Sequence, residues 1–199
     1  MSNNPDTRPR CIVLDVDGTL ADNIPVRFPE NNPNYCPSFV TNVLGIQVRT
    51  PANILPKPIA RPGLSEFLAF VFEEFDSVMI WTAAIPLWYE KVYREVLKPN
   101  LPPGKDFHFV KTRDQTKPYV HLKPLSEIYA KFPQYSSTNT LVVDDNPATF
   151  RDNVENAVHI PGFFYDKLST LAEERVRLAK EDRGLYDAME VIRQRLGNW

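Results

Sequence analysis

The chain has 199 residues and a formal net charge of −2, with 24% charged and 43% hydrophobic residues. These values are typical of a single globular domain that buries a hydrophobic core. The net charge excludes a broadly positive surface that would attract nucleic acid or an anionic membrane. No apolar run approaches the roughly 20 residues that a membrane span needs, and residues 1–10 lack the apolar core of a signal peptide. We expect a soluble intracellular protein, cytoplasmic or nuclear, that is a monomer or a weak dimer.

The N-terminal part of the chain is expected to contain one core strand and a long irregular segment. Residues 1–10 are polar and predict a flexible arm, whereas the apolar, β-branched residues 11–16 predict a buried strand. Ten of the 19 prolines lie in the first 62 residues, so residues 21–60 are expected to be irregular. The exception is a candidate hairpin formed by residues 39–44 and 46–49.

Further along the chain, strand and helix patterns alternate. Helices are expected at 64–75, from 86 to about 98, at 124–132, from 146 onward and over 166–196. Strands are expected at 78–81, 107–110, 119–120, 141–143 and 157–160. This alternation predicts an α/β fold, a Rossmann-like and mainly parallel sheet with helices on both faces and a small β insertion. In such sheets the ligand site lies beyond the carboxyl ends of the strands.

Polar side chains follow three of the predicted core strands. Asp15 and Asp17 follow the first strand, Thr82 follows the strand at 78–81, and Asp144 and Asp145 follow the strand at 141–143. Taken one at a time, an Asp-Gly pair is common in turns and an Asp pair is common at helix caps. Because parallel strands end at one edge of a sheet, we expect these side chains to converge there.

Such a set of residues suits phosphate-ester chemistry. Two acidic pairs at neighbouring strand ends repel each other unless a cation binds, and carboxylate oxygens are ligands that Mg²⁺ prefers. One aspartate could attack phosphorus while the second transfers the proton of the leaving alcohol. Thr82 could bind phosphate oxygens, and a lysine would neutralise the transferred group.

Other phosphate and metal chemistries lack their required spacing. The residues six positions after Cys11 and Cys36 are Asp17 and Asn42, so the C-x₅-R pattern of cysteine phosphatases is absent. Neither a P-loop nor a G-x-G dinucleotide pattern occurs, and the three histidines form no H-E-x-x-H motif. The cysteines form no C-x-x-C pair and no disulfide framework, which fits a reducing compartment.

The motifs and their order resemble those of the haloacid dehalogenase superfamily. Residues 15–20, Asp-Val-Asp-Gly-Thr-Leu, look like its DxDGTL signature. Within it, the chain is similar to the branch of RNA polymerase II C-terminal-domain phosphatases, also called NLI-interacting-factor-like phosphatases. Four further segments carry that likeness: 61–68 (RPGLSEFL), 78–84 (VMIWTAA), 123–126 (KPLS) and 141–158, with its Asp-Asp-Asn-Pro and Asn-Ala-Val.

The resemblance implies a role for each matching residue. Asp15 would be the nucleophile and Asp17 the general acid and base. Thr82, Ala83 and Lys123 would bind the phosphoryl group, and Thr19 would supply a supporting hydroxyl. Mg²⁺ would be held by Asp15, by the backbone carbonyl of Asp17 and by Asp145, with Asp144 supporting Lys123 or a metal-bound water. Which of Asp144 and Asp145 binds the metal directly stays open.

The implied organisation is an arm at 1–10, a phosphatase domain at 11–165 and a helical extension at 166–199 packed on the same domain. The resemblance implies an Mg²⁺-dependent phosphatase that forms an aspartyl-phosphate on a phosphorylated protein or peptide, with the polymerase C-terminal domain as one candidate substrate. Two alternatives stay open: a small-molecule or nucleotide phosphatase of the same superfamily, and an inactive binding module on this fold.

Overall fold

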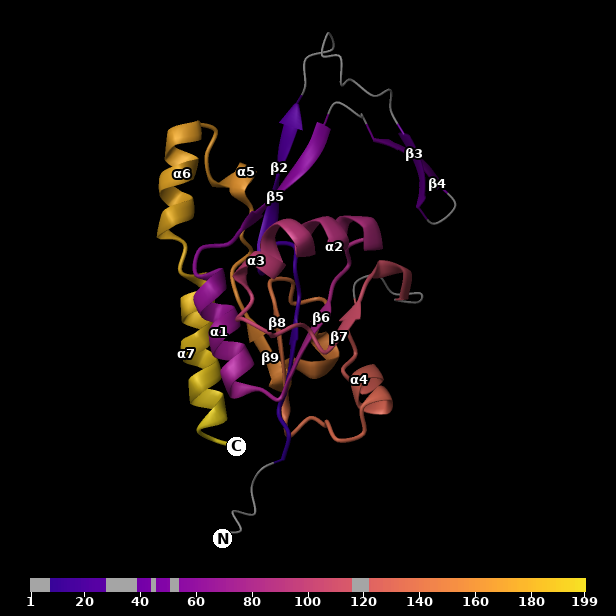
Figure 1. Cartoon of the computed structure of the whole chain (residues 1–199), viewed down its shortest axis with the longest axis vertical. Helices are drawn as coiled ribbons and strands as arrows, with labels where there is room; N and C mark the ends of the chain where they lie inside the picture. The colour runs from indigo at the N-terminus through magenta and orange to yellow at the C-terminus, as the bar shows by residue number, and fades with distance from the viewer. Residues whose placement is uncertain (1–7, 28–38, 44–45, 51–53, 116–121) are drawn as a thin grey trace.

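The centre of the molecule is a parallel five-stranded sheet with the strand order β7-β6-β1-β8-β9 (Figure 1). The computed structural model describes residues 8–27, 39–43, 46–50, 54–115 and 122–199. The strands of this sheet are β1 (Cys11–Leu14), β6 (Ser77–Trp81), β7 (Phe109–Lys111), β8 (Thr140–Asp144) and β9 (Ala157–His159). The predicted parallel α/β fold is confirmed.

Helices cover both faces of this sheet, as the sequence predicted. Because side chains alternate along a strand, Ile12 and Leu14 of β1 face one core cluster while Cys11 and Val13 face the other. The helices on the first face are α1 (Leu64–Glu74), α2 (Pro86–Val92) with its continuation through a π-helical turn (Tyr93–Leu97) into α3 (Lys98–Asn100), and α7 (Gly184–Leu196). On the second face lie α4 (Ser126–Lys131) and a 3₁₀ helix (Arg151–Asn156).

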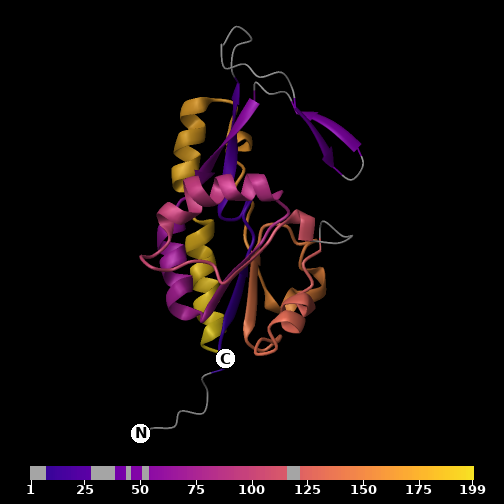
Figure 2. The same ribbon diagram turned by 45° about the vertical axis from the view of Figure 1, so that its right-hand side comes forward.

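The proline-rich segment is more regular than the sequence predicted. The expected hairpin is present as β3 (Phe39–Val43) paired with β4 (Ile46–Thr50). A second antiparallel pair, β2 (Ala21–Arg27) with β5 (Ile54–Ala60), was not predicted, because Pro25, Pro56 and Pro58 lie within these strands. A two-stranded ribbon tolerates proline, since each strand has one edge that needs no partner. Both views show these strands projecting beyond the carboxyl ends of the central sheet (Figures 1 and 2).

Most of the remaining predicted elements are present with shifted bounds. The predicted helix from 146 is instead an Asx turn, in which Asn146 Oδ1 accepts the Ala148 N–H at 3.1 Å, followed by the 3₁₀ helix. The strand predicted at 119–120 lies outside the described residues. The C-terminal helical region divides into α5 (Tyr165–Leu168), α6 (Ala172–Glu181) and α7. Within the described part of the chain, none of the helices combines the length and apolarity needed to cross a bilayer.

Cys11 provides a reporter of unfolding. The residue is fully buried, and this burial raises the pKa of its thiol to about 12. In a Cys36→Ser variant, we expect Cys11 to react with Ellman's reagent only after a denaturant is added, because the native thiol is neither accessible nor ionised. Absorbance with and without guanidinium chloride measures this, and rapid labelling of the native variant would contradict it.

Candidate active site

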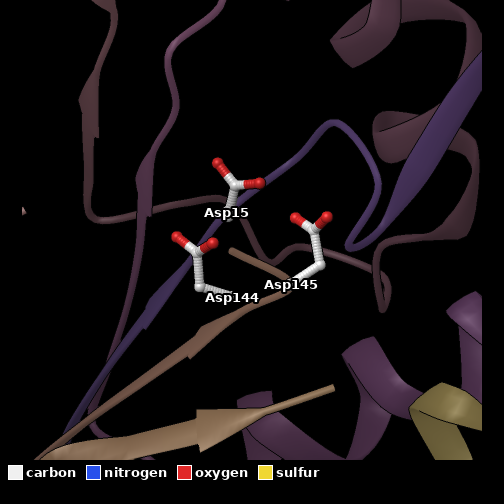
Figure 3. A group of neighbouring side chains, drawn as sticks. All are labelled: Asp15, Asp144 and Asp145. Atoms are coloured by element: carbon white, nitrogen blue, oxygen red, sulfur yellow. The ribbon is translucent and has the colours of Figure 1, made fainter. Parts of the chain in front are cut away.

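Two neighbouring strands bring the acidic residues together. Asp15 directly follows β1, and Asp144 is the last residue of β8, which pairs with β1 in parallel. The Asp15 N–H donates to Val143 O at 3.0 Å, so the strand pairing extends to Asp15 itself. Figure 3 shows the carboxylates of Asp15, Asp144 and Asp145 pointing to the same side of the sheet. One oxygen of each lies within 4.8 Å of the other two.

The turn after Asp15 is tightly hydrogen-bonded. Val16 O accepts the N–H groups of Thr19, Leu20 and Ala21 at 3.2, 2.8 and 3.0 Å. Gly18 has a φ of +80°, and a Cβ there would lie 2.8 Å from Asp145 Oδ2. Glycine is therefore required both by the backbone conformation and by the close approach of a site carboxylate.

Thr19 lies behind the acidic cluster. Its buried Oγ1 is 3.3 Å from Asp15 Oδ2 and 3.2 Å from Asp145 Oδ1, and it accepts the Asp145 N–H at 3.1 Å. A hydroxyl has one proton, so it donates to one carboxylate at a time. Thr19 thus fixes the separation of the β1 and β8 ends.

Lys123 is the cation of the cluster. Its buried Nζ lies 2.5 Å from Asp15 Oδ1 and 2.6 Å from Asp144 Oδ2. The main chain is held as well, since the Lys123 N–H donates to Thr149 O at 2.7 Å and Asn153 Nδ2 donates to Lys123 O at 3.1 Å. Burial pulls the pKa of Lys123 down, but the two carboxylates outweigh it and the pKa is raised. The ammonium therefore stays charged.

The carboxylates outnumber this cation. Burial raises the pKa of Asp15, with smaller increases from Asp144 and Asp17 that Lys123 partly offsets. Burial followed by the charge of Asp144 raises the pKa of Asp145 in the same direction. A second cation at the cluster would relieve this repulsion. The donors are all hard carboxylate oxygens, which fit Mg²⁺.

Asp17 lies outside these ion pairs. Its Oδ1 accepts a hydrogen bond of 2.9 Å from the indole Nε1–H of Trp88 on α2. Burial raises the pKa of Asp17, and the indole hydrogen bond partly opposes the increase. The sequence did not predict this contact of Trp88, since nothing in the local pattern connects the indole with a carboxylate 71 positions away.

Thr82 and Ala83 line the same cavity as the carboxylates. The chain leaves β6 at Trp81, and Thr82 Oγ1 accepts the Ala84 N–H at 3.1 Å, which makes a tight turn before α2. Arg113 ties this turn to the end of β7, because its Nε donates to Ala83 O at 2.5 Å.

The cavity that these residues line has a volume of about 180 Å³. Its lining holds the predicted residues Asp15, Asp17, Thr82, Ala83, Lys123, Asp144 and Asp145, together with Asn146 and Thr149, which were not predicted. A hollow of about 220 Å³ between β7 and α4 is slightly larger, but its Lys111 and Glu127 are paired with each other. The smaller cavity, where the carboxylates converge, is the candidate active site.

Trp88 can be tested by replacement. Trp88→Phe replaces the indole by a phenyl ring that has no N–H. Asp17 then loses the hydrogen-bond donor that orients it. For the phosphatase activity that the resemblance implies, we expect kcat toward p-nitrophenyl phosphate to fall about three- to tenfold, as the loss of one hydrogen bond of about 1 kcal/mol implies. Steady-state kinetics measure it, and an unchanged kcat would show that the bond does not orient Asp17.

The comparisons with known proteins agree with this geometry. The sequence model of the family described as "NLI interacting factor-like phosphatase" matches residues 10–186. The chain belongs to this family. The match extends past residue 165 into α7, further than the motifs alone indicated.

Two of the curated relatives of this chain are described as ubiquitin-like domain-containing CTD phosphatases. The "Ubiquitin-like domain-containing CTD phosphatase" of Arabidopsis thaliana is 31% identical over 115 residues, which are 54% of this chain and 34% of the relative. The corresponding human protein is 30% identical over 112 residues, 53% of this chain and 35% of the relative. The chain therefore aligns with about a third of the length of these curated relatives.

A solved structure supports the fold. The structure of "Fcp1, an essential RNA polymerase II CTD phosphatase" matches 90% of this chain and 52% of its own, with a TM-score of 0.54 and 22% identity. At this identity the likeness shows the shared fold alone. The expected haloacid dehalogenase type of fold is confirmed.

Proposed function

We propose that this protein is a phosphomonoester hydrolase that forms an aspartyl-phosphate on Asp15. The observation that carries the proposal is the convergence of Asp15, Asp17 and Lys123 in one cavity, with Thr82 in its wall. Asp15 is held by Lys123 and Thr19, so its carboxylate is fixed for in-line attack. The Asp17 carboxyl accepts a hydrogen bond from a neutral donor, the Trp88 indole, which suits a group that gains and loses a proton.

The reaction divides between these residues. Asp15 attacks phosphorus and forms a covalent phosphoryl bond, while Asp17 gives its proton to the departing alkoxide. Asp17 then takes a proton from the water that hydrolyses the aspartyl-phosphate, which regenerates the Asp15 carboxylate and the protonated Asp17. Lys123, the Thr82 hydroxyl and the Ala83 N–H would bind the phosphoryl oxygens as charge redistributes.

A magnesium ion is proposed as the cofactor. Asp15 and Asp145 would hold it together with the backbone carbonyl of Asp17, and Asp144, which is paired with Lys123, would stand beside it. When bound, Mg²⁺ neutralises phosphate charge and so lowers the barrier to attack by an anion.

The proposed substrate is a phosphorylated serine or threonine in a protein segment. The relatives' descriptions as CTD phosphatases support this, and the polymerase C-terminal domain is the first candidate. We further propose that the protein acts as a monomer or weak dimer in the cytoplasm or nucleus, without binding nucleic acid or membrane. Residues 166–199 are proposed to belong to the same domain, since Leu185 and Ile192 of α7 lie in the core beside α1.

Turnover of p-nitrophenyl phosphate with and without Mg²⁺ tests the activity. We expect hydrolysis that disappears with EDTA and returns with Mg²⁺. No metal-dependent turnover would favour an inactive binding module instead. A phosphoserine peptide, a nucleotide monophosphate and a sugar phosphate, compared by kcat/KM, then separate a protein phosphatase from a small-molecule phosphatase.

A further inference from the structure

A fully buried arginine, Arg61, contacts the turn of residues 16–21 that follows Asp15, which we call the catalytic turn. Arg61 stands between β5 and α1, and its side chain has no exposed surface. Its Nε and Nη2 donate to Asp182 Oδ1 and Oδ2 at 2.7 and 3.0 Å, a two-point ion pair. Asp182 belongs to the link between α6 and α7, so the pair joins parts of the chain 121 positions apart.

The remaining nitrogen of the guanidinium contacts the catalytic turn. Arg61 Nη1 lies 3.3 Å from both Gly18 O and Thr19 O and donates to them. Phe163, whose ring lies under the guanidinium, also donates its N–H to Gly18 O at 2.7 Å. Arg61 thus holds the backbone of the catalytic turn at Gly18 and Thr19.

The link between α6 and α7 is shaped around this guanidinium. A Cβ on Gly184 would lie 2.0 Å from Arg61 Nη2, so a larger residue there would displace the guanidinium. The Gly184 N–H donates to Asp182 Oδ1 at 3.2 Å and holds that carboxylate toward Arg61. Asp182 in the link and Gly184, the first residue of α7, therefore serve the same contact.

We propose that Arg61 and Asp182 form a positioning pair, through which the C-terminal helices set the geometry of the turn that carries Asp17 and Thr19. This inference rests on the proposed function of that turn. The guanidinium is a planar fork, so fixing two of its nitrogens on Asp182 fixes the direction of the third. A displacement of about 1 Å at a reacting group costs about a hundredfold in rate, which gives such a remote pair its influence.

The main test replaces Asp182 by the neutral isostere in Asp182→Asn. We expect kcat toward p-nitrophenyl phosphate to fall about ten- to a hundredfold, because a loosened turn misplaces Asp17. KM should change less than about threefold, since Lys123 and Thr82 are not contacted by the pair. Asp182→Glu keeps the charge and should recover a large part of kcat.

A readout independent of activity is amide hydrogen exchange in peptides covering residues 15–22. Asp182→Asn should speed exchange there, because Gly18 O and Thr19 O lose their fixed donor. Gly184→Ala keeps Asp182 but displaces Arg61, and it should give the same pattern. This second variant keeps the test usable if Asp182→Asn does not fold.

Arg195→Ala is the matched control. Arg195 also ties α7 to the body of the protein, through Glu155 O at 2.5 Å and Ala157 O at 2.8 Å, but it does not touch the turn. We expect this variant to lose thermal stability while kcat and the exchange of residues 15–22 stay unchanged.

Two results would overturn the positioning role. One is unchanged exchange at residues 15–22 in both Asp182→Asn and Gly184→Ala. The other is an equal loss of kcat in Asp182→Asn and Arg195→Ala, which would indicate general destabilisation. If the wild-type protein shows no phosphatase activity, the proposed function fails, but the exchange comparison still decides whether Arg61 and Asp182 hold the turn.

Discussion

Asp15→Asn is expected to lower kcat toward p-nitrophenyl phosphate by more than about a thousandfold, because the attacking carboxylate is lost. The replacement keeps the size of the side chain, so the cavity and the contacts of Thr19 should persist. The same variant should fail to form an acid-stable, base-labile phosphoprotein when a phosphodonor is supplied. Steady-state kinetics and quenched-flow trapping measure the two effects. Retained turnover would exclude Asp15 as the nucleophile.

The Asp15→Asn variant should also differ from wild type in stability. Measuring this difference shows whether activity is lost because the nucleophile is absent or because the protein unfolds. Burial raises the pKa of Asp15 from its ordinary 3.8 to about 7, so the folded protein holds this proton more tightly than the unfolded chain does. The ionised carboxyl therefore destabilises the fold progressively between about pH 4 and about pH 7, and the cost is constant above that range. In metal-free buffer, Asp15→Asn should melt higher than wild type at about pH 7.5, with a smaller difference at about pH 4.5. A variant that melts lower at neutral pH would show that the ionised carboxyl stabilises the cluster.

The sequence predicted the strands and their polar ends because both signals are local. A buried apolar run that ends in Asp15-Val16-Asp17-Gly18 specifies a strand, a turn and an acidic site within a few residues. The parallel sheet then requires these ends to meet. Lys123 pairs with Asp144, which is one of the two contacts that the resemblance implied for Asp144, whereas its ion pair with Asp15 was not predicted. Proline, also a local signal, predicted irregular chain at Pro25 and Pro56, but two strands pair there through the N–H groups of the other residues.

The contacts that the sequence could not predict are the distant ones. Trp88 and Asp17 meet because α2 crosses above the turn, and Arg61 meets Asp182 because the C-terminal helices return to the sheet. A tryptophan in a helix and an aspartate in a charged link have ordinary explanations as core and surface residues. Only the packing of α2 and α7 on one face of the sheet distinguishes this tryptophan and this aspartate from other residues of the same kinds.

Lys123→Ala should both inactivate and destabilise the protein. Without Lys123, three carboxylates remain clustered with their oxygens within 4.8 Å and without the ammonium that pairs with two of them. Breaking a buried pair of this kind costs about 3–5 kcal/mol, so a clear fall in melting temperature is expected in metal-free buffer. We also expect kcat to fall by about a hundredfold or more, because the transferred phosphoryl group loses a cation.

Magnesium should rescue the stability of Lys123→Ala but not its turnover. The cluster becomes more negative when Lys123 is removed, so added Mg²⁺ should raise the melting temperature of the variant more than that of wild type. Lys111→Ala is the matched control, since Lys111 is also a buried lysine, is paired with Glu127 and stacks on Trp81, outside the cavity. This control should lose stability without any change in kcat or in the Mg²⁺-dependent shift. If Mg²⁺ shifts the melting of Lys123→Ala and Lys111→Ala equally, the three carboxylates are not the metal site, and the charge balance proposed for Lys123 is wrong.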